Sequence, residues 1–250
     1  MIGFPLRVPC VLRGDALVVT PSGRGVRVAI VDSGVNPSHP HVGHVAGGIA
    51  IVGNGFEPGA EHADYLDRLG HGTAVTAAIK EKAPDVELFA VKVFDRALST
   101  NIASLVTGID WAANAGMHLV NLSLGTSRQI HEQVLRAAVD RATARGTLIV
   151  SAYEDGEARW LPGSLPGVIP VVVDYALARD QYRVADVGGV TLFHASGFAR
   201  EIPGVAPERN LHGISLAVAN MTGFAARAAE VCADRSFESL IRALIDQISS

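Results

Sequence analysis

Cysteine is scarce in this sequence. Among 250 residues there are two cysteines, Cys10 and Cys232, which lie near opposite ends of the chain. Disulfide frameworks, zinc sites and redox motifs need several cysteines or a short spacing between two of them. We therefore expect two buried thiols, and we expect neither a metal site nor a cofactor.

The chain also has no basic run and no long apolar run. Its 21 basic and 25 acidic residues give a formal charge of -4, whereas a nucleic-acid backbone or an anionic membrane attracts clustered Lys and Arg. No apolar stretch reaches the length of a membrane span. Arg7, Arg13 and Asp15 interrupt the stretch that a signal peptide would keep apolar. We expect a cytoplasmic protein that binds neither nucleic acid nor membrane.

Apolar residues make up 48% of the sequence, which is enough for a large core. Short apolar runs alternate with segments in which apolar residues recur at spacings of three and four. The runs cover 26–31, 87–93, 119–123, 147–152 and 168–173, and the helical segments cover 73–82, 102–114, 130–144 and 236–248. This alternation predicts a three-layer α/β fold, a doubly wound parallel sheet with helices on both faces, in one domain over residues 1–250.

Three short motifs place Asp32, His71 and Ser215 in that order along the chain, as Asp-Ser-Gly, His-Gly-Thr and Gly-Ile-Ser. A serine hydroxyl becomes nucleophilic when a neutral imidazole takes its proton and a carboxylate fixes the tautomer of that imidazole. The three residues are therefore a candidate catalytic triad. Taken singly, each has a plainer interpretation: a turn or cap carboxylate, a solvent-facing histidine and a helix N-cap serine.

The motifs and their flanks resemble the subtilisin-like (subtilase) serine peptidases over about residues 24–232. Matching pieces continue in family order at Leu88-Phe89-Ala90-Val91-Lys92-Val93 and at Phe224-Ala225-Ala226. The resemblance implies a subtilisin-like fold and an endopeptidase that cuts a peptide or protein substrate through an acyl-serine intermediate. Secreted members of the family usually carry an N-terminal prodomain, and we expect none within residues 1–250.

The resemblance also implies a substrate groove. The segment Asn-Leu-Ser-Leu-Gly at 121–125 matches the family segment whose edge pairs with an extended peptide. We expect Ser123, Leu124 and Gly125 to bind the peptide backbone. The alternative for this segment is an ordinary strand end.

The position of the family's oxyanion donor departs from the family pattern, and Ala219 and Asn220 stand where the family usually has Pro and His. Subtilases stabilise the oxyanion with an asparagine amide in a segment resembling Ala-Ala-Gly-Asn-Glu-Gly, and the corresponding stretch here, 151–156, reads Ser-Ala-Tyr-Glu-Asp-Gly. Glu154 takes the asparagine position when Gly156 is aligned, and a shift of one residue puts Asp155 there. An ionised carboxylate cannot donate a hydrogen bond.

Glu154 leaves several interpretations open. In the first, burial keeps Glu154 neutral, so that it donates its own proton. In the second, the loop turns Glu154 outward. In the third, the enzyme works slowly, or only with an activating partner whose identity the sequence does not give. The contrasting hypothesis is a peptide-binding pseudo-protease that is non-catalytic or very weakly active.

Two further clusters have plainer interpretations. The histidines at 39, 41 and 44 predict a surface turn rather than a metal site. The carboxylates before His71 predict a solvated loop rather than a site that selects basic peptide residues. These carboxylates are Glu57, Glu61, Asp64 and Asp67.

Overall fold

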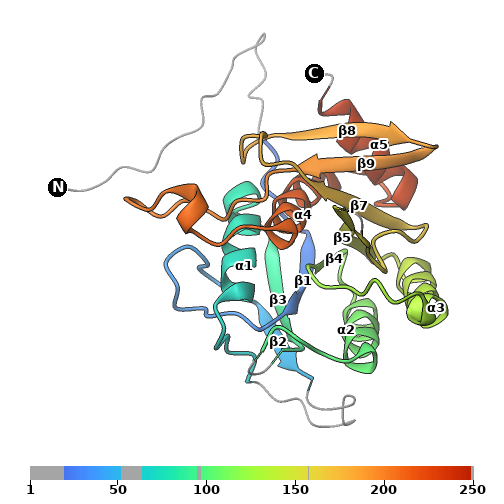
Figure 1. The fold of residues 1–250 in the computed structure, drawn as a ribbon, viewed down its shortest axis with the longest axis horizontal. Helices are drawn as coiled ribbons and strands as arrows, with labels where there is room; N and C mark the ends of the chain where they lie inside the picture. Colours follow the sequence, from blue (N-terminus) through green and yellow to red (C-terminus); the bar gives the residue numbers. More distant parts are fainter. Residues whose placement is uncertain (1–19, 52–63, 95–96, 157, 249–250) are drawn as a thin grey trace.

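A single sheet forms the middle layer of the fold (Figure 1). The structure is a computed structural model that describes residues 20–51, 64–94, 97–156 and 158–248. The strand order is β2-β3-β1-β4-β5-β7-β9-β8, and β6 pairs with the end of β5. The strands are β1 Arg27–Asp32, β2 Gly47–Ala50, β3 Glu87–Lys92, β4 Leu119–Leu122, β5 Leu148–Asp155, β6 Ala158–Arg159, β7 Val168–Val173, β8 Tyr182–Val187 and β9 Val190–Ala195.

Most neighbouring strands run parallel, and only β6 on β5 and β8 on β9 are antiparallel among the described pairs. Helices cover both faces of the sheet. They are α1 His71–Lys82, α2 Ile102–Asn114, α3 Glu132–Ala144, α4 Ile214–Val231 and α5 Phe237–Asp246, with short 3₁₀ turns η1 Gln129–His131 and η2 Pro207–Arg209. This arrangement confirms the three-layer α/β prediction.

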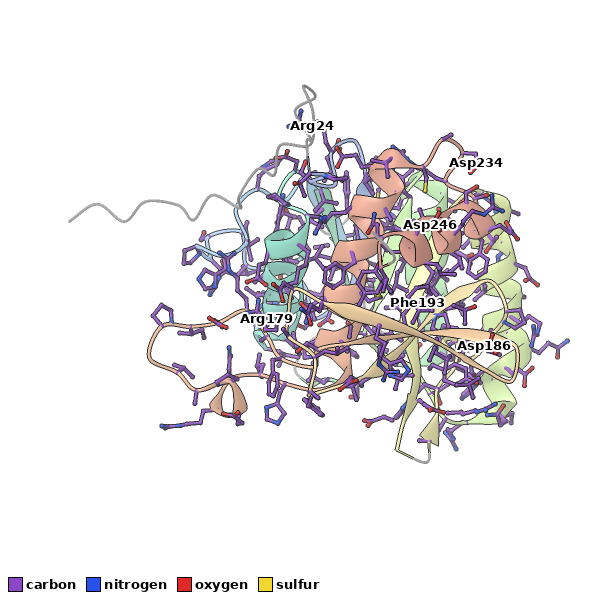
Figure 2. All side chains as sticks on the ribbon, turned by 90° about the horizontal axis from the view of Figure 1, so that it is seen from above. Arg24, Arg179, Asp186, Phe193, Asp234 and Asp246 are labelled. Atoms are coloured by element: carbon purple, nitrogen blue, oxygen red, sulfur yellow. The ribbon has the colours of Figure 1, made fainter. Side chains whose placement is uncertain are left out.

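Alternation along the strands produces two apolar cores. Val28 and Ile30 of β1 pack in the core that also contains α1, α4 and α5. Ala29 and Val31 point to the opposite face, where α2 and α3 pack. Because both faces of a parallel sheet are covered, the strand reads as a continuous apolar run. Phe193 of β9 is fully buried, and Figure 2 labels it together with charged residues such as Arg179 and Asp186.

Several elements agree with the sequence prediction and others do not. The bounds of α2 and β7 are confirmed, whereas α1 begins at His71, two residues before the predicted start. The strands β2 and β8 were not predicted, because β2 reads Gly-Gly-Ile-Ala and β8 is a half-exposed edge strand. Cys232 is a free, partly buried thiol rather than a fully buried one, and Cys10 lies outside the described residues. No helix in the described ranges is both long and apolar enough to cross a bilayer.

Candidate active site

Asp32 is the last residue of β1, which lies in the sheet between β3 and β4. Its side chain is fully buried. Oδ1 accepts the Ser33 backbone N–H at 2.7 Å and lies 2.7 Å from Nδ1 of His71. A carboxylate can only accept, so the proton between them belongs to Nδ1 and the neutral ring keeps a lone pair on Nε2. Asp32 and His71, two of the three candidate triad residues, thus lie in hydrogen-bond contact.

His71 opens α1 at a point where the backbone passes close to β1. Gly70, just before it, has φ 84°, a left-handed conformation that favours glycine. A Cβ on Gly72, just after it, would lie 2.1 Å from the carbonyl oxygen of Gly34 and 3.2 Å from Oδ1 of Asp32. The two glycines that flank His71 therefore let its ring reach the buried carboxylate.

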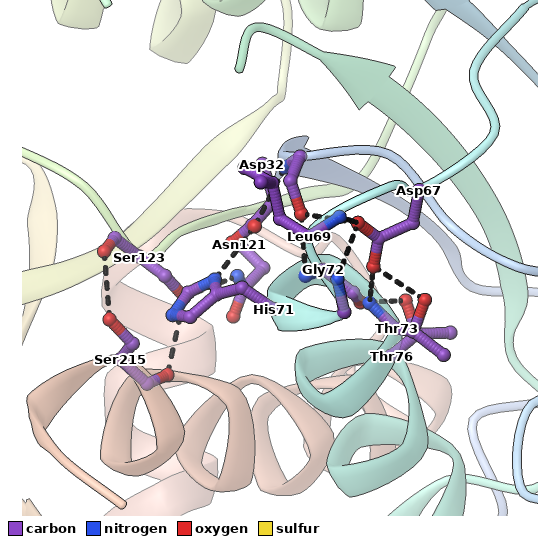
Figure 3. Close-up of polar contacts among 12 residues, drawn as sticks. Asp32, Asp67, Leu69, His71, Gly72, Thr73, Thr76, Asn121, Ser123 and Ser215 are labelled. Atoms are coloured by element: carbon purple, nitrogen blue, oxygen red, sulfur yellow. Dashed lines mark hydrogen bonds and ion pairs between the residues drawn. The ribbon is translucent and has the colours of Figure 1, made fainter. Parts of the chain in front are cut away.

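Asp67 holds the start of α1 in place. Its Oδ1 accepts hydrogen bonds from Ser33 Oγ, Leu69 N and Gly70 N, each at 2.9 Å. Its Oδ2 accepts from the backbone N–H of Thr73 at 2.9 Å and from Thr73 Oγ1 at 2.6 Å. Five donors thus converge on one half-buried carboxylate, which ties β1 to the helix that carries His71 (Figure 3).

The prediction of a solvated loop is wrong for Asp67. It holds for Asp64, which is exposed and pairs with Arg68 on the surface. Glu57 and Glu61 lie outside the described residues. The signal in the sequence was the spacing of Asp67, six residues before Thr73 at a helix start, because carboxylates commonly satisfy the unpaired N–H groups of a first helical turn.

The charges around His71 set its protonation. Burial lowers the pKa of His71 and is the largest single influence. The hydrogen bond to Asp32 and the negative charges of Asp32 and Asp67 together outweigh burial, so the pKa of His71 is raised above its ordinary value of 6.5. The neutral form that can accept a proton therefore becomes dominant only at a pH above that value.

Ser215 lies in the first turn of α4 and is hydrogen-bonded to the segment after β4. Its Oγ donates to the carbonyl oxygen of Ser123 at 3.1 Å, and Ser123 Oγ donates to the carbonyl oxygen of Ser215 at 3.2 Å. Asn121 donates to Ser123 Oγ at 2.8 Å and accepts from Thr222 of α4 at 2.9 Å. Figure 3 shows the ring of His71 between Asp32 and Ser215. The described hydrogen bond of Ser215 Oγ goes to Ser123 and not to His71.

The segment predicted to bind peptide backbone lies next to Ser215. Ser123 and Leu124 are half-buried, and Gly125 is exposed. A Cβ on Gly125 would lie 2.5 Å from the carbonyl oxygen of Leu161, so only glycine fits there. After Gly125, the next described backbone hydrogen bonds outside the helices and strands join Thr126 and Leu161.

Glu154 follows an irregularity in β5. The register of β5 against β7 shifts between Ala152 and Glu154, so that Glu154 pairs with Val172. Val172 pairs in turn with His194 of β9. Directly paired residues of neighbouring strands point to the same face of a sheet, and the residues that flank His194 in the sequence, Phe193 and Ala195, point into the core of α1 and α4.

Glu154 therefore points with His194 toward the face opposite α4. Electrostatics agree, since the pKa of His194 is lowered by burial and by Arg183 while Asp174 and Glu154 act to raise it. Among the interpretations open from the sequence, this position fits an outward-turned Glu154. Asp155, the alternative, is exposed and pairs with Ala158 of β6.

The histidine cluster has no metal-binding arrangement. His39 and His41 lie edge to face with ring centroids 5.2 Å apart, and His44 is exposed. Within the described ranges, no three His, Cys, Asp or Glu side chains are grouped so that they could hold a metal ion.

Sequence comparison identifies the family. A family model for the subtilase family matches residues 23–172, which is more than half of the chain. This chain belongs to the subtilase family. The matched range contains Asp32, His71 and the segment 123–125, and it ends before Ser215.

Curated relatives of this subtilase are proteases. A thermostable alkaline protease of Halalkalibacterium halodurans is 40% identical over 139 residues, which cover 52% of this chain and 36% of the relative. Subtilisin Savinase of Lederbergia lenta is 38% identical over 140 residues, 52% of this chain and 48% of the relative. The minor extracellular protease Epr of Bacillus subtilis is 32% identical over 174 residues, 66% of this chain and 25% of the relative. The matches thus span half or less of each relative.

A solved structure shares the fold of this subtilase. The crystal structure of a cold adapted subtilisin-like serine proteinase superposes with a TM-score of 0.67 and 21% sequence identity, and the match covers 92% of this chain and 85% of that chain. The predicted subtilisin-like architecture is confirmed. Family membership and the named relatives support a serine peptidase.

Proposed function

We propose that this subtilase is a serine endopeptidase that cuts peptide bonds through an acyl-serine intermediate, with Ser215 as nucleophile, His71 as general base and acid, and Asp32 as the group that orients His71. The observation that carries the proposal is the 2.7 Å contact between His71 Nδ1 and a fully buried Asp32. This contact directs the lone pair of Nε2 away from Asp32, and Ser215 lies on that side of the ring (Figure 3).

The proton transfers follow from this geometry. Ser215 Oγ leaves the carbonyl of Ser123, gives its proton to Nε2 of His71 and attacks the peptide carbonyl carbon. His71 then gives the proton to the leaving nitrogen as the C–N bond breaks, which leaves an ester on Ser215 and frees the amine. Water repeats the sequence and releases the acid. The first-turn N–H groups of α4 favour the negative charge that develops beside Ser215.

The substrate side of the proposal rests on the segment after β4. An extended peptide would lie along Ser123, Leu124 and Gly125 and add a strand through main-chain hydrogen bonds. Gly125 lies against Leu161 with no room for a side chain, so the peptide would meet bare backbone there. We infer that the chain processes a specific peptide rather than degrading proteins broadly.

A fluorophosphonate probe tests the nucleophile, because it reacts with an activated serine. We expect an adduct on Ser215, located by mass spectrometry of the digested protein. Ser33 and Ser123 in the same site serve as internal controls and should stay unmodified. The raised pKa of His71 predicts that labelling rises with pH through a midpoint above 6.5, since only the neutral imidazole accepts the proton. An adduct on Ser33 or Ser123 instead of Ser215 would contradict the proposal.

Two observations favour a peptide-binding pseudo-protease as the second candidate. Ser215 Oγ donates to the carbonyl of Ser123, and Glu154, which alignment on Gly156 puts at the position of the family's oxyanion donor, points with His194. This candidate predicts that peptides bind while no adduct forms on Ser215 at any pH from about 5 to 9, which includes the interval in which histidine titrates.

The substitution Glu154→Asn tests whether the side chain at position 154 lies beside His194 or reaches the oxyanion. With the side chain beside His194, we expect the labelling rate to change by less than about threefold, and the pKa of His194 to fall because a negative charge is removed. Imidazole NMR titration measures the pKa, and Asp155→Asn is the matched control. A rate increase of about 100-fold or more would mean that the new amide reaches the oxyanion, contrary to this orientation.

A further inference from the structure

A cavity of about 260 Å³ opens beside α1. One wall is the start of α1, where Ala74 and Ala77 are small and leave space. The other wall is the loop between β9 and α4, which contributes Arg200 and Leu211. The proposed catalytic steps use none of these four residues.

The cavity adjoins the candidate active site. Gly70 in its lining immediately precedes His71, and Leu211 lies four residues before Ser215. Asp67, which also lines the cavity, lies in Figure 3 on the opposite side of His71 from Ser123. A peptide whose acyl part lies along Ser123 would therefore send its leaving part past His71 toward the cavity.

Arg200 supplies the positive charge in this lining. Its guanidinium donates to the carbonyl oxygen of His41 at 3.3 Å, and its own carbonyl accepts from Asn210 at 2.9 Å. The guanidinium and the backbone of Arg200 are thus each held by one hydrogen bond, and the described bond of the guanidinium uses one of its five N–H donors. A positioned guanidinium matches the two oxygens of a carboxylate.

The other titratable groups of the lining do not cancel this charge. The carboxylate of Asp67 accepts five hydrogen bonds from its own loop and from α1. His39 accepts the backbone N–H of His41 on its Nδ1, which leaves Nε2 as the donor of the neutral ring. Burial, Arg200 and His39 lower the pKa of His41, so at neutral pH its ring is uncharged.

We propose that this cavity binds a carboxylate on the leaving side of the substrate, either an Asp or Glu side chain or the C-terminal carboxylate of a short peptide. The proposal rests on the proposed peptidase function for its orientation, but not for the binding itself. Arg200 holds the carboxylate, and the small side chains of Ala74 and Ala77 provide the room that the segment needs.

Binding is tested on the full chain carrying Ser215→Ala, so that no probe is consumed. The probes are Ala-Glu-NH₂ against Ala-Gln-NH₂ for the side chain, and Ala-Ala with a free carboxylate against Ala-Ala-NH₂ for the chain end. Titrations follow the imidazole NMR signals of His39 and His41. In one of the two pairs, we expect the acid to bind at least about fivefold more tightly than its amide. The pair that shows this preference identifies the source of the carboxylate.

Two variants connect this preference to the cavity. Arg200→Gln should equalise acid and amide, and Ala74→Met should weaken both by filling the space. Arg209→Gln removes an exposed charge from the same loop and should leave the preference unchanged. Equal affinities in the Ser215→Ala chain, or a preference that survives Arg200→Gln, would overturn the proposal.

An acyl-transfer assay tests the side of the substrate. Wild-type chain acylated by a simple N-acylamino-acid ester partitions between water and the two amines of the preferred pair, and we expect the acid to capture about fivefold more acyl group than its amide. Ester turnover without this preference would contradict the cavity alone. A binding preference without any ester turnover would contradict the peptidase proposal and leave the cavity standing.

Discussion

Asp32→Asn is expected to lower the rate of Ser215 labelling by about 10⁴-fold, the size of effect found when the carboxylate of a Ser-His-Asp triad is neutralised. The structure gives the reason. Oδ1 faces both the Ser33 N–H and Nδ1 of His71, and Oδ2 is buried without a described hydrogen bond. An asparagine oxygen at Oδ1 keeps the contact but removes the charge that stabilises the imidazolium. The reversed amide places N–H groups against two donors and disturbs the tautomer.

The pKa of His71 gives this prediction a second readout. The hydrogen bond and charge of Asp32 act to raise that pKa against burial, so it should fall in Asp32→Asn. Asp110→Asn is the matched control, because Asp110 pairs with Arg141 on the surface far along the chain from the site and should change neither rate nor pKa. A labelling rate within about tenfold of wild type would contradict the assigned role of Asp32.

The sequence predicts those elements best that carry both a clear period and a clear end. The bounds of α2 follow from its apolar spacing and from Asn101, whose side chain caps the helix by accepting from Ser104 N. The sequence did not predict β2 and β8, because β2 is a short glycine-rich strand and β8 is a half-exposed edge strand whose one partner among the described strands is β9. In both cases tertiary pairing rather than local pattern makes the strand.

Long-range contacts limit what the sequence predicts about the site. The end of β1 and the start of α1 are local features, so Asp32 and His71 could be placed from their motifs. The reciprocal bonds between Ser123 and Ser215 join residues 92 positions apart, and no local pattern encodes them. Because of these bonds, the hydroxyl of Ser215 donates to the backbone carbonyl of Ser123 rather than to the imidazole of His71.

The orientation of Glu154 could not be predicted from the alternation of side chains along a strand, because the register of β5 shifts just before it. Ala152 points into the core of α1 and α4, and strict alternation would send Glu154 to that same face. The register shift between the two residues reverses the direction, because one extra residue in a strand flips every side chain that follows. The identity of the residue was predictable from the sequence, whereas its orientation depends on the pairing of β5 with β7.

Asp67→Asn is expected to destabilise the fold by about 2–4 kcal/mol and to slow the labelling of Ser215, because an amide cannot accept all five hydrogen bonds. Whichever way it turns, its NH₂ group faces N–H or O–H donors of Ser33 and the start of α1, or of Thr73. The loss of this negative charge also removes one influence that raises the pKa of His71. Denaturant unfolding and the pH profile of labelling measure the two effects.

The pH dependence of stability separates this role from a general effect of charge. Burial acts to raise the pKa of Asp67, but hydrogen bonds from Thr73, Leu69 and Gly70 outweigh it and hold the pKa below its ordinary 3.8. Its stabilisation is therefore present above the unfolded pKa and is lost as pH falls through the folded pKa. Asp67→Asn should remove this component, whereas Asp64→Asn, which breaks an exposed pair with Arg68, should leave stability, labelling rate and His71 pKa unchanged. Equal behaviour of the two variants would show that Asp67 does not position His71.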